Sequence, residues 1–273
     1  MPEALSLSFL VILVPVLVAY LLTPCFIQVQ SAKNVCATNF KGTKIVTGGG
    51  LILLAALAGV IFFNSFILQE KLIPGVMFLY LGGITFLGMY DDLQGEKSCK
   101  GFRGHFQKFW CKGEITTGLY KAAGGLILGT LVAAPGGGSG GEWLLKGIFL
   151  ALFSNFFNLL DTRPARAAKF FFLFSFVFIL VYKVNILPLF TLWSALYIYL
   201  YWELKQKIML GDAGAYLLGG ALGFYLITVS SPGVLLFLTA LLAILHYFGE
   251  KFSFSRFLEG KLLFLRGPAG KGN

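Results

Sequence analysis

Nine apolar runs, separated by short polar segments, dominate the pattern of hydrophobic and polar positions along the chain. A helix needs about 20 mostly apolar residues to cross the hydrocarbon core of a bilayer, so runs of this kind indicate membrane-spanning helices, several of them near the short limit. We therefore predict an all-α fold, a polytopic membrane helix bundle of about nine transmembrane helices that forms one integral membrane domain over residues 1–273. The runs are Leu5–Leu22, Gly50–Leu68, Ile73–Tyr90, Leu119–Ala134, Trp143–Leu160, Ala167–Tyr182, Ile186–Trp202, Ala213–Val229 and Val234–Phe248.

Composition and charge support this topology. Of the 273 residues, 57% are hydrophobic and only 12% are charged, which excludes a soluble domain. If all nine runs cross, the segments 23–49, 91–118, 161–169, 203–212 and 249–273 share one side, and together with Lys121 they hold 19 of the 22 Lys and Arg residues. Positive charge accumulates on the cytoplasmic side, so we expect the N-terminus outside and the C-terminus inside. The net charge of +10 then reflects topology in a multi-pass cell-membrane protein, and nucleic acid is not an expected partner.

All four aspartates of the chain fall on this basic side. Asp91 and Asp92 end the third apolar run, Asp161 follows the fifth, and Asp212 precedes the eighth. A carboxylate at a helix C-terminus opposes the helix dipole, and adjacent carboxylates repel each other, so a divalent cation would relieve the cost. The alternative is that these carboxylates are only solvated residues at the ends of helices.

Asparagine and glycine residues beside the aspartates strengthen the case for a site. Asn155, Asn158 and Asp161 recur at every third position, which places them on one face of a helix. The segment Gly211-Asp212-Ala-Gly214 puts Asp212 at the start of a helix, where backbone N–H groups favour anions. Simpler interpretations remain for both patterns, as helix-packing asparagines and as a helix N-cap.

These segments, in their order and spacing, resemble the motifs of the polyprenyl-phosphate N-acetylhexosamine-1-phosphate transferases, a family of membrane enzymes. The resemblance runs from about residue 40 to residue 230. Its DD, NxxNxxD and GDxG motifs are matched by Gly88-Met-Tyr-Asp91-Asp92, Asn155-x-x-Asn158-x-x-Asp161 and Leu210-Gly-Asp212-x-Gly214. In addition, Lys44-Ile-Val-Thr-Gly-Gly-Gly50 looks like the glycine-rich entry to the second span, and Lys121 falls where the family has a lysine opening the fourth.

The resemblance implies transfer of a sugar-1-phosphate, such as an N-acetylhexosamine-1-phosphate, from a UDP-sugar to a polyprenyl phosphate, with Mg2+ or Mn2+ as cofactor. It implies that Asp91 is a base or positions the lipid phosphate, and that Asp92 and Asp212 hold the metal. It also implies that Lys121 contacts phosphate, and that the nucleotide-sugar site is lined by Asn155, Asn158 and Asp161. The implied partners are a polyprenyl phosphate, a UDP-amino sugar and membrane lipids, and a homodimer stays open.

The sequence departs from the family pattern in three places. Asp161 is followed by Thr-Arg-Pro-Ala-Arg, so Arg163 and Arg166 bring two guanidinium groups where the family has glycines. The histidine-rich loop after the ninth span is replaced by residues 249–256, in which Lys251 and Arg256 could supply the cations for the diphosphate. The family's tenth span is missing, because residues 261–266 are too short to cross a membrane.

Three other functions fit parts of the sequence. A catalytically inactive family member could act as a membrane scaffold, and a transporter would also be a polytopic bundle, although transporters carry ionisable groups near the bilayer midplane. A CDP-alcohol phosphatidyltransferase shares a partial match with Asp161-Thr-Arg-Pro-Ala-Arg166, but the aspartates that should follow are absent from 170–181. A sugar-1-phosphate transferase is the prediction that accounts for all the motifs together.

Overall fold

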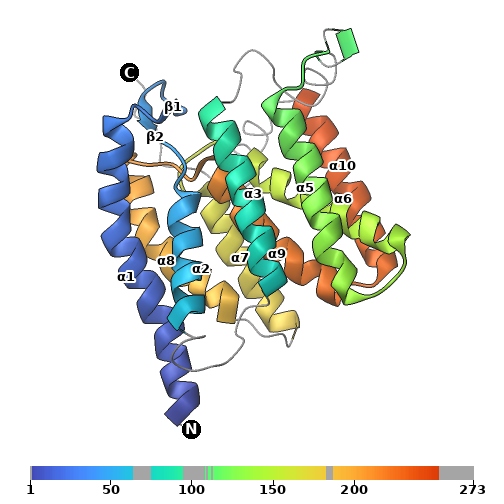
Figure 1. The fold of residues 1–273 in the computed structure, drawn as a ribbon, viewed down its shortest axis with the longest axis horizontal. Helices are drawn as coiled ribbons and strands as arrows, with labels where there is room; N and C mark the ends of the chain where they lie inside the picture. The colour runs from blue at the N-terminus through green and yellow to red at the C-terminus, as the bar shows by residue number, and fades with distance from the viewer. Residues whose placement is uncertain are drawn as a thin grey trace.

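A computed structural model describes residues 2–63, 75–94, 108, 110–111, 113–182 and 187–251 of the chain. It confirms the predicted all-α class, since long helices make up the bundle and the strands among the described residues form one short hairpin (Figure 1). The elements are α1 (Pro2–Ala32), β1 (Cys36–Thr38), β2 (Lys44–Val46), α2 (Gly50–Phe63), α3 (Gly75–Gln94), α5 (Thr117–Ala133), η2 (Ala134–Gly136), α6 (Gly140–Leu160), α7 (Arg166–Val181), α8 (Leu187–Leu204), α9 (Gly211–Val229) and α10 (Pro232–Lys251).

Each predicted apolar run falls on a helix in the part of the chain that is described. Among those residues, six helical segments are long and apolar enough to cross a membrane: Val11–Ala32, Gly75–Gln94, Thr117–Gly136, Gly140–Leu160, Gly211–Val229 and Pro232–Gly249. The helix α2 has 14 described residues and α7 has 16, which is short for a crossing. The structure therefore supports a membrane protein, while nine crossings and the sides of the termini remain predictions.

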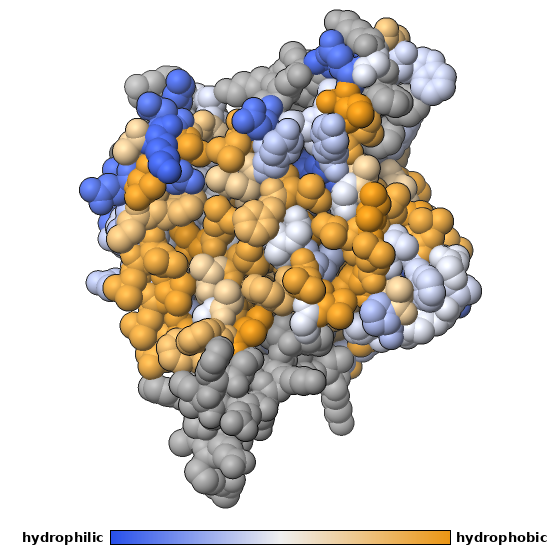
Figure 2. Space-filling view, in the orientation of Figure 1, coloured by the Kyte–Doolittle hydropathy of each residue, from blue (hydrophilic) through white to orange (hydrophobic). Residues whose placement is uncertain are grey.

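The outer surface of the bundle is apolar. Large hydrophobic side chains such as Leu79, Phe86 and Ile127 are exposed on α3 and α5. Figure 2 shows a broad hydrophobic surface across the middle of this face, with hydrophilic residues gathered at the end that carries the hairpin. A soluble monomer rarely exposes so large a continuous apolar surface, so a lipid environment is the natural surrounding for it.

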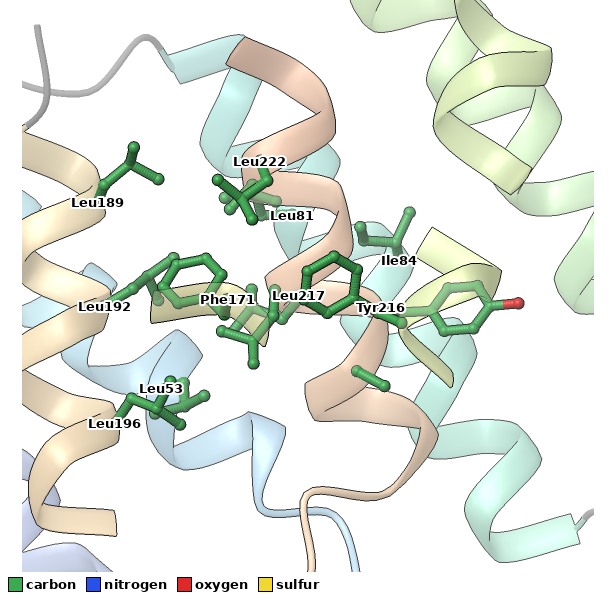
Figure 3. Packing of buried hydrophobic residues seen from close by; sticks show 14 of the residues in the cluster. Leu53, Leu81, Ile84, Phe171, Leu189, Leu192, Leu196, Tyr216, Leu217 and Leu222 are labelled. Carbon is green, nitrogen blue, oxygen red and sulfur yellow. The ribbon is translucent and has the colours of Figure 1, made fainter. Parts of the chain in front are cut away.

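The helix α9 forms the centre of the bundle and is buried along most of its length. It packs against α3 and α6, and also against α2 and α7. Figure 3 shows Leu81 of α3, Phe171 of α7 and Leu192 of α8 gathered around Leu217 of α9. The glycine-rich face of α9 lets neighbours approach closely, because a Cβ at Gly219 would lie only 2.7 Å from the Cα of α6 Ser154. This central helix brings its first turn to one end of the bundle.

The β1–β2 hairpin was not among the elements that the apolar pattern predicts. Its two strands pair antiparallel, and the Asn39 side chain organises the turn by accepting backbone hydrogen bonds from Lys41 and Thr43 at 2.9 and 3.0 Å. The hairpin is joined to the segment before α9, because Val46 forms a parallel bridge with Ile208 and its carbonyl accepts from the Met209 N–H at 2.9 Å. The hairpin therefore lies at the same end of the bundle as the first turn of α9.

Candidate functional site

Carboxylates from three other elements meet the first turn of α9. The two oxygens of Asp92, near the end of α3, accept hydrogen bonds from the backbone N–H groups of Asp212 at 3.1 Å and Ala213 at 3.3 Å. The Asp161 carboxylate, just after α6, accepts from the Gly211 N–H, and Glu203, in the last turn of α8, accepts from the N–H of Leu210. Four successive N–H groups, at positions 210–213, are thus satisfied by acidic side chains.

This arrangement explains how aspartates persist at helix C-termini. From the sequence, Asp91, Asp92 and Asp161 are unfavourable at the C-termini of their helices, because each carboxylate opposes the dipole of its own helix. In the fold, Asp92 and Asp161 point at the N-terminus of α9, whose unpaired N–H groups and positive dipole end favour anions. These N–H groups offset part of the cost of placing Asp92 and Asp161 at the C-termini of their own helices.

Close packing at this end depends on glycines. Gly211 has φ +67°, the left-handed region, and a Cβ there would lie 2.9 Å from Asp92 Oδ1 and collide with Thr47 Oγ1. At Gly88 of α3, a Cβ would lie 2.7 Å from the backbone of Ala213. These glycines allow α3 and the hairpin segment to approach α9 closely enough for the carboxylates to reach its N–H groups.

Lys121 places its ammonium group between two of the aspartates. Its Nζ lies 2.6 Å from Asp91 Oδ2 and also pairs with Asp212 Oδ2, so α3, α5 and α9 are joined through one cation. Lys121 is buried, and Thr117 donates a further hydrogen bond to Asp91. The predicted convergence of Asp91, Asp92 and Asp212 at one end of the bundle is therefore present, and Lys121 lies at its centre.

The ammonium group at this point corrects the prediction that the cluster needs an external cation. From the sequence alone, the aspartates are expected to repel one another unless a metal or a substrate cation neutralises them. Lys121 supplies an intrinsic cation for Asp91 and Asp212, and the N–H groups of α9 stabilise Asp92, so the cluster is tolerable as architecture. Its presence alone therefore does not demonstrate a metal.

The same geometry fits a divalent metal by donor type. Across the described ranges, no group of three His, Cys, Asp or Glu side chains is close enough to enclose a metal ion. Mg2+, however, is usually held by one or two carboxylates together with water and substrate phosphates. Asp212 has a carboxylate neighbour on either side: it shares the Lys121 ammonium with Asp91, and its backbone N–H donates to Asp92, so two carboxylates are available beside it, as such a site requires.

A pocket opens beside the aspartate cluster, between the hairpin and the segments that flank α9. Arg163 lines it, with its guanidinium carbon 4.3 Å from the centroid of the Phe40 ring. Asp161 and Glu203 contribute carboxylates to its wall. The lining residues are Asn39, Phe40, Ile45, Asp161, Thr162, Arg163, Pro164, Glu203, Ile208 and Met209.

The two carboxylates of the pocket differ in environment from ordinary surface acids. Glu203 is only 1% exposed, and its Oε2 has no hydrogen-bond partner. Burial raises the pKa of the Asp161 carboxyl well above its usual range, and the nearby negative charges of Glu203, Asp212 and Asp92 raise it further. A pocket with these acids, one aromatic ring and one guanidinium can offer stacking, hydrogen-bond acceptors and a cation to a polar ligand.

The remaining predicted site residues are more dispersed. Asn155 Oδ1 accepts a hydrogen bond from the Tyr216 hydroxyl at 2.9 Å, and Asn158 is half-buried one turn before Asp161. Arg166 is completely buried, and its Nη1 donates to Thr162 Oγ1 at 2.7 Å. The Lys251 side chain and Arg256 lie outside the described residues, so the proposed replacement for the histidine loop stays a prediction.

Three residues of this end were not identified from the sequence. Glu203 is a single acid directly after an apolar run, and that position was its only signal. Tyr216 follows Asp212 by four residues, which places both on one face of α9, but it resembles an ordinary core aromatic. Thr47 lies in the glycine-rich segment, and its buried hydroxyl, which has no hydrogen-bond partner, lies next to Gly211.

Comparison with known proteins adds no relative to this picture, since no protein-family model matches the chain and no curated protein matches it. The chemistry therefore has to be read from the site itself. A lysine between two carboxylates and a pocket with an arginine are groups that can bind phosphate, orient a metal and hold a polar ligand.

Proposed function

We propose that the protein transfers a sugar-1-phosphate, an N-acetylhexosamine-1-phosphate, from a UDP-sugar to a polyprenyl phosphate at the cytoplasmic face of the membrane. The observation that carries the proposal is the Asp91–Lys121–Asp212 cluster, held at one end of an apolar bundle beside the Arg163–Phe40 pocket. In this reaction an oxygen of the lipid phosphate becomes bonded to the sugar-linked phosphorus, and the bond to UMP breaks.

The apolar bundle supplies access for a lipid substrate. The cluster lies at the ends of α3 and α9, so a phosphate head group at the membrane boundary can reach it while the polyprenyl chain stays in the hydrocarbon region. In the proposed topology, nine helices cross, the N-terminus is outside and the C-terminus is inside. Two observations support this topology. With nine crossings, 19 of the 22 Lys and Arg residues fall on one side, and segments predicted to share that side contact one another in the fold.

The side chains of the cluster have separate tasks in this proposal. Asp91 orients the lipid phosphate or accepts its proton, and Lys121 binds a phosphate oxygen and balances negative charge. Asp212 and Asp92 would hold Mg2+, which would supply positive charge to balance the diphosphate. A water-poor setting strengthens each of these electrostatic interactions, which favours transfer to the lipid over hydrolysis.

The pocket holds the nucleotide-sugar in this proposal. Phe40 presents an aromatic face, Arg163 a guanidinium for phosphate, and Asp161 and Glu203 acceptors for N–H or hydroxyl groups. Two residues of the pocket wall connect it to the start of α9. Asp161 accepts a hydrogen bond from the Gly211 N–H, and Met209 lies two residues before Gly211. In this proposal the diphosphate of the nucleotide-sugar faces the aspartate cluster.

A reconstituted assay tests this function. Purified protein in detergent is incubated with Mg2+, a C55 polyprenyl phosphate and a panel of UDP-sugars, and UMP release and the lipid product are measured together. We expect UMP and a lipid-linked sugar diphosphate in equal amounts with at least one UDP-N-acetylhexosamine, and loss of both when Mg2+ is chelated. UMP release without a lipid product, or no release with any sugar, would contradict the proposal.

A further inference from the structure

Tyr216 contacts two residues of the candidate site. Its hydroxyl donates to Asn155 Oδ1 on α6 at 2.9 Å, and the Lys121 Nζ lies over its ring, 5.0 Å from the centroid. The tyrosine is only 3% exposed, and Figure 3 shows its hydroxyl pointing away from the leucine side chains of the core. One side chain of α9 thus connects α6 to the ammonium group between α3 and α9.

A ring in this place restricts a side chain that is otherwise flexible. Lysine carries its charge on a stem of four carbons, and holding that stem in one rotamer costs conformational entropy. Asp91 and Asp212 attract the ammonium from two directions, and either carboxylate alone could draw it away from the other. The negative face of the Tyr216 ring adds a third contact from the same helix as Asp212.

We propose that Tyr216 is a positioning residue whose ring holds the Lys121 ammonium between Asp91 and Asp212. The effect of this contact on transfer rests on the proposed function, whereas the position of the ammonium does not. The hydroxyl contacts Asn155, which the resemblance places in the nucleotide-sugar site.

The consequences differ between the ring and the hydroxyl. Tyr216→Leu removes the ring, so Lys121 gains access to other rotamers and to solvent. Tyr216→Phe keeps the ring and loses only the hydrogen bond to Asn155. The cation contact therefore survives in the phenylalanine variant, which should retain most of the wild-type behaviour.

Chemical labelling of lysine tests the position of Lys121 without reference to activity. Purified protein is treated with a limiting amount of a lysine-specific acylating reagent, and the modification rate of Lys121 is measured by mass spectrometry relative to the exposed Lys44. We expect slow modification in the wild type and in Tyr216→Phe, and at least a threefold faster rate in Tyr216→Leu. The matched control is Tyr225→Leu, which removes another buried tyrosine of α9 that packs against Phe178.

The same variants are then assayed for transfer. We expect Tyr216→Leu to lower kcat about tenfold with little change in KM, and Tyr216→Phe and Tyr225→Leu to stay within about threefold of the wild type. A Lys121 modification rate in Tyr216→Leu equal to that of the wild type would overturn the placement of Lys121 by Tyr216. Unchanged kcat despite faster modification would overturn the effect of this contact on transfer. If Tyr216→Leu is modified faster but the wild type itself transfers no sugar, the result would support the placement of Lys121 by Tyr216 and refute the proposed function.

Discussion

Replacing the buried carboxylate of Glu203 should weaken the connection between three segments of the site. Glu203 accepts hydrogen bonds from the backbone N–H groups of Leu210, before α9, and Ala165, before α7. Leucine in Glu203→Leu has a similar volume but no hydrogen-bond acceptor, so both N–H groups lose their partner. Because Glu203 is only 1% exposed, water cannot easily replace the carboxylate. Glu203→Gln keeps an acceptor oxygen and removes the charge.

The expected magnitude follows from the two hydrogen bonds. An unsatisfied buried N–H costs about 1–3 kcal/mol, so the leucine variant should lose about 2–6 kcal/mol of unfolding free energy. The glutamine variant retains the acceptor and relieves repulsion between Glu203 and Asp161, so its change should stay within about 1 kcal/mol. The difference between the two variants isolates the acceptor, because both lack the charge.

Thermal unfolding of the detergent-purified protein measures this difference. We expect the midpoint of Glu203→Leu to lie well below that of Glu203→Gln at the same pH and detergent concentration. Two midpoints that both equal the wild-type value would refute the reasoning, because they would show that these N–H groups do not depend on Glu203. Two midpoints that both lie well below the wild-type value would also refute it, because they would place the stabilisation in the charge.

Three further predictions follow from the pocket and the topology. Arg163→Ala removes the guanidinium over Phe40 and should raise KM for the UDP-sugar about tenfold with little change in kcat, as steady-state kinetics would show. The raised pKa of Asp161 means that the fold favours its protonated form, so the contribution of Asp161 to stability is greatest below about pH 4 and is lost as pH rises. Asp161→Asn should therefore raise the unfolding midpoint at neutral pH relative to the midpoint at low pH, as midpoints measured across pH would show. In cells expressing a variant free of native cysteines, an impermeant thiol reagent should label Lys146→Cys from outside and should label Lys44→Cys only after permeabilisation, and the reverse pattern would contradict the topology.

Much of the helical architecture could be predicted because it depends on continuous apolar runs. The run Trp143–Leu160, for example, gives α6 almost to its ends, since both boundaries coincide with strong changes in polarity. The end of α1 could not be predicted in this way. The apolar run ends at Leu22, but the helix continues to Ala32. Its last turns contain Gln28, Gln30 and Ser31, polar residues that form no apolar pattern.

The site could be predicted only as far as the membrane boundary. Alternation of spans is enough to bring Asp91, Asp161 and Asp212 to one side, and the structure brings all three to the first turn of α9. The sequence could not show that Asp92 would accept hydrogen bonds from α9, or that Lys121 would lie between two carboxylates. Those contacts depend on how close α3, α5 and α9 approach, which is a property of their packing.

The most direct test of the central claim is the rate of UMP release by Asp212→Asn, measured with Mg2+, a C55 polyprenyl phosphate and the UDP-sugar that the wild type uses. This change keeps the shape of the side chain and removes the charge that pairs with Lys121. A matched control is Glu142→Gln, which removes an acid from the first turn of α6, at the other end of that helix from Asp161. The account predicts that Asp212→Asn is folded but releases no UMP above background, while Glu142→Gln retains the wild-type rate. A wild-type rate of UMP release by Asp212→Asn would contradict it.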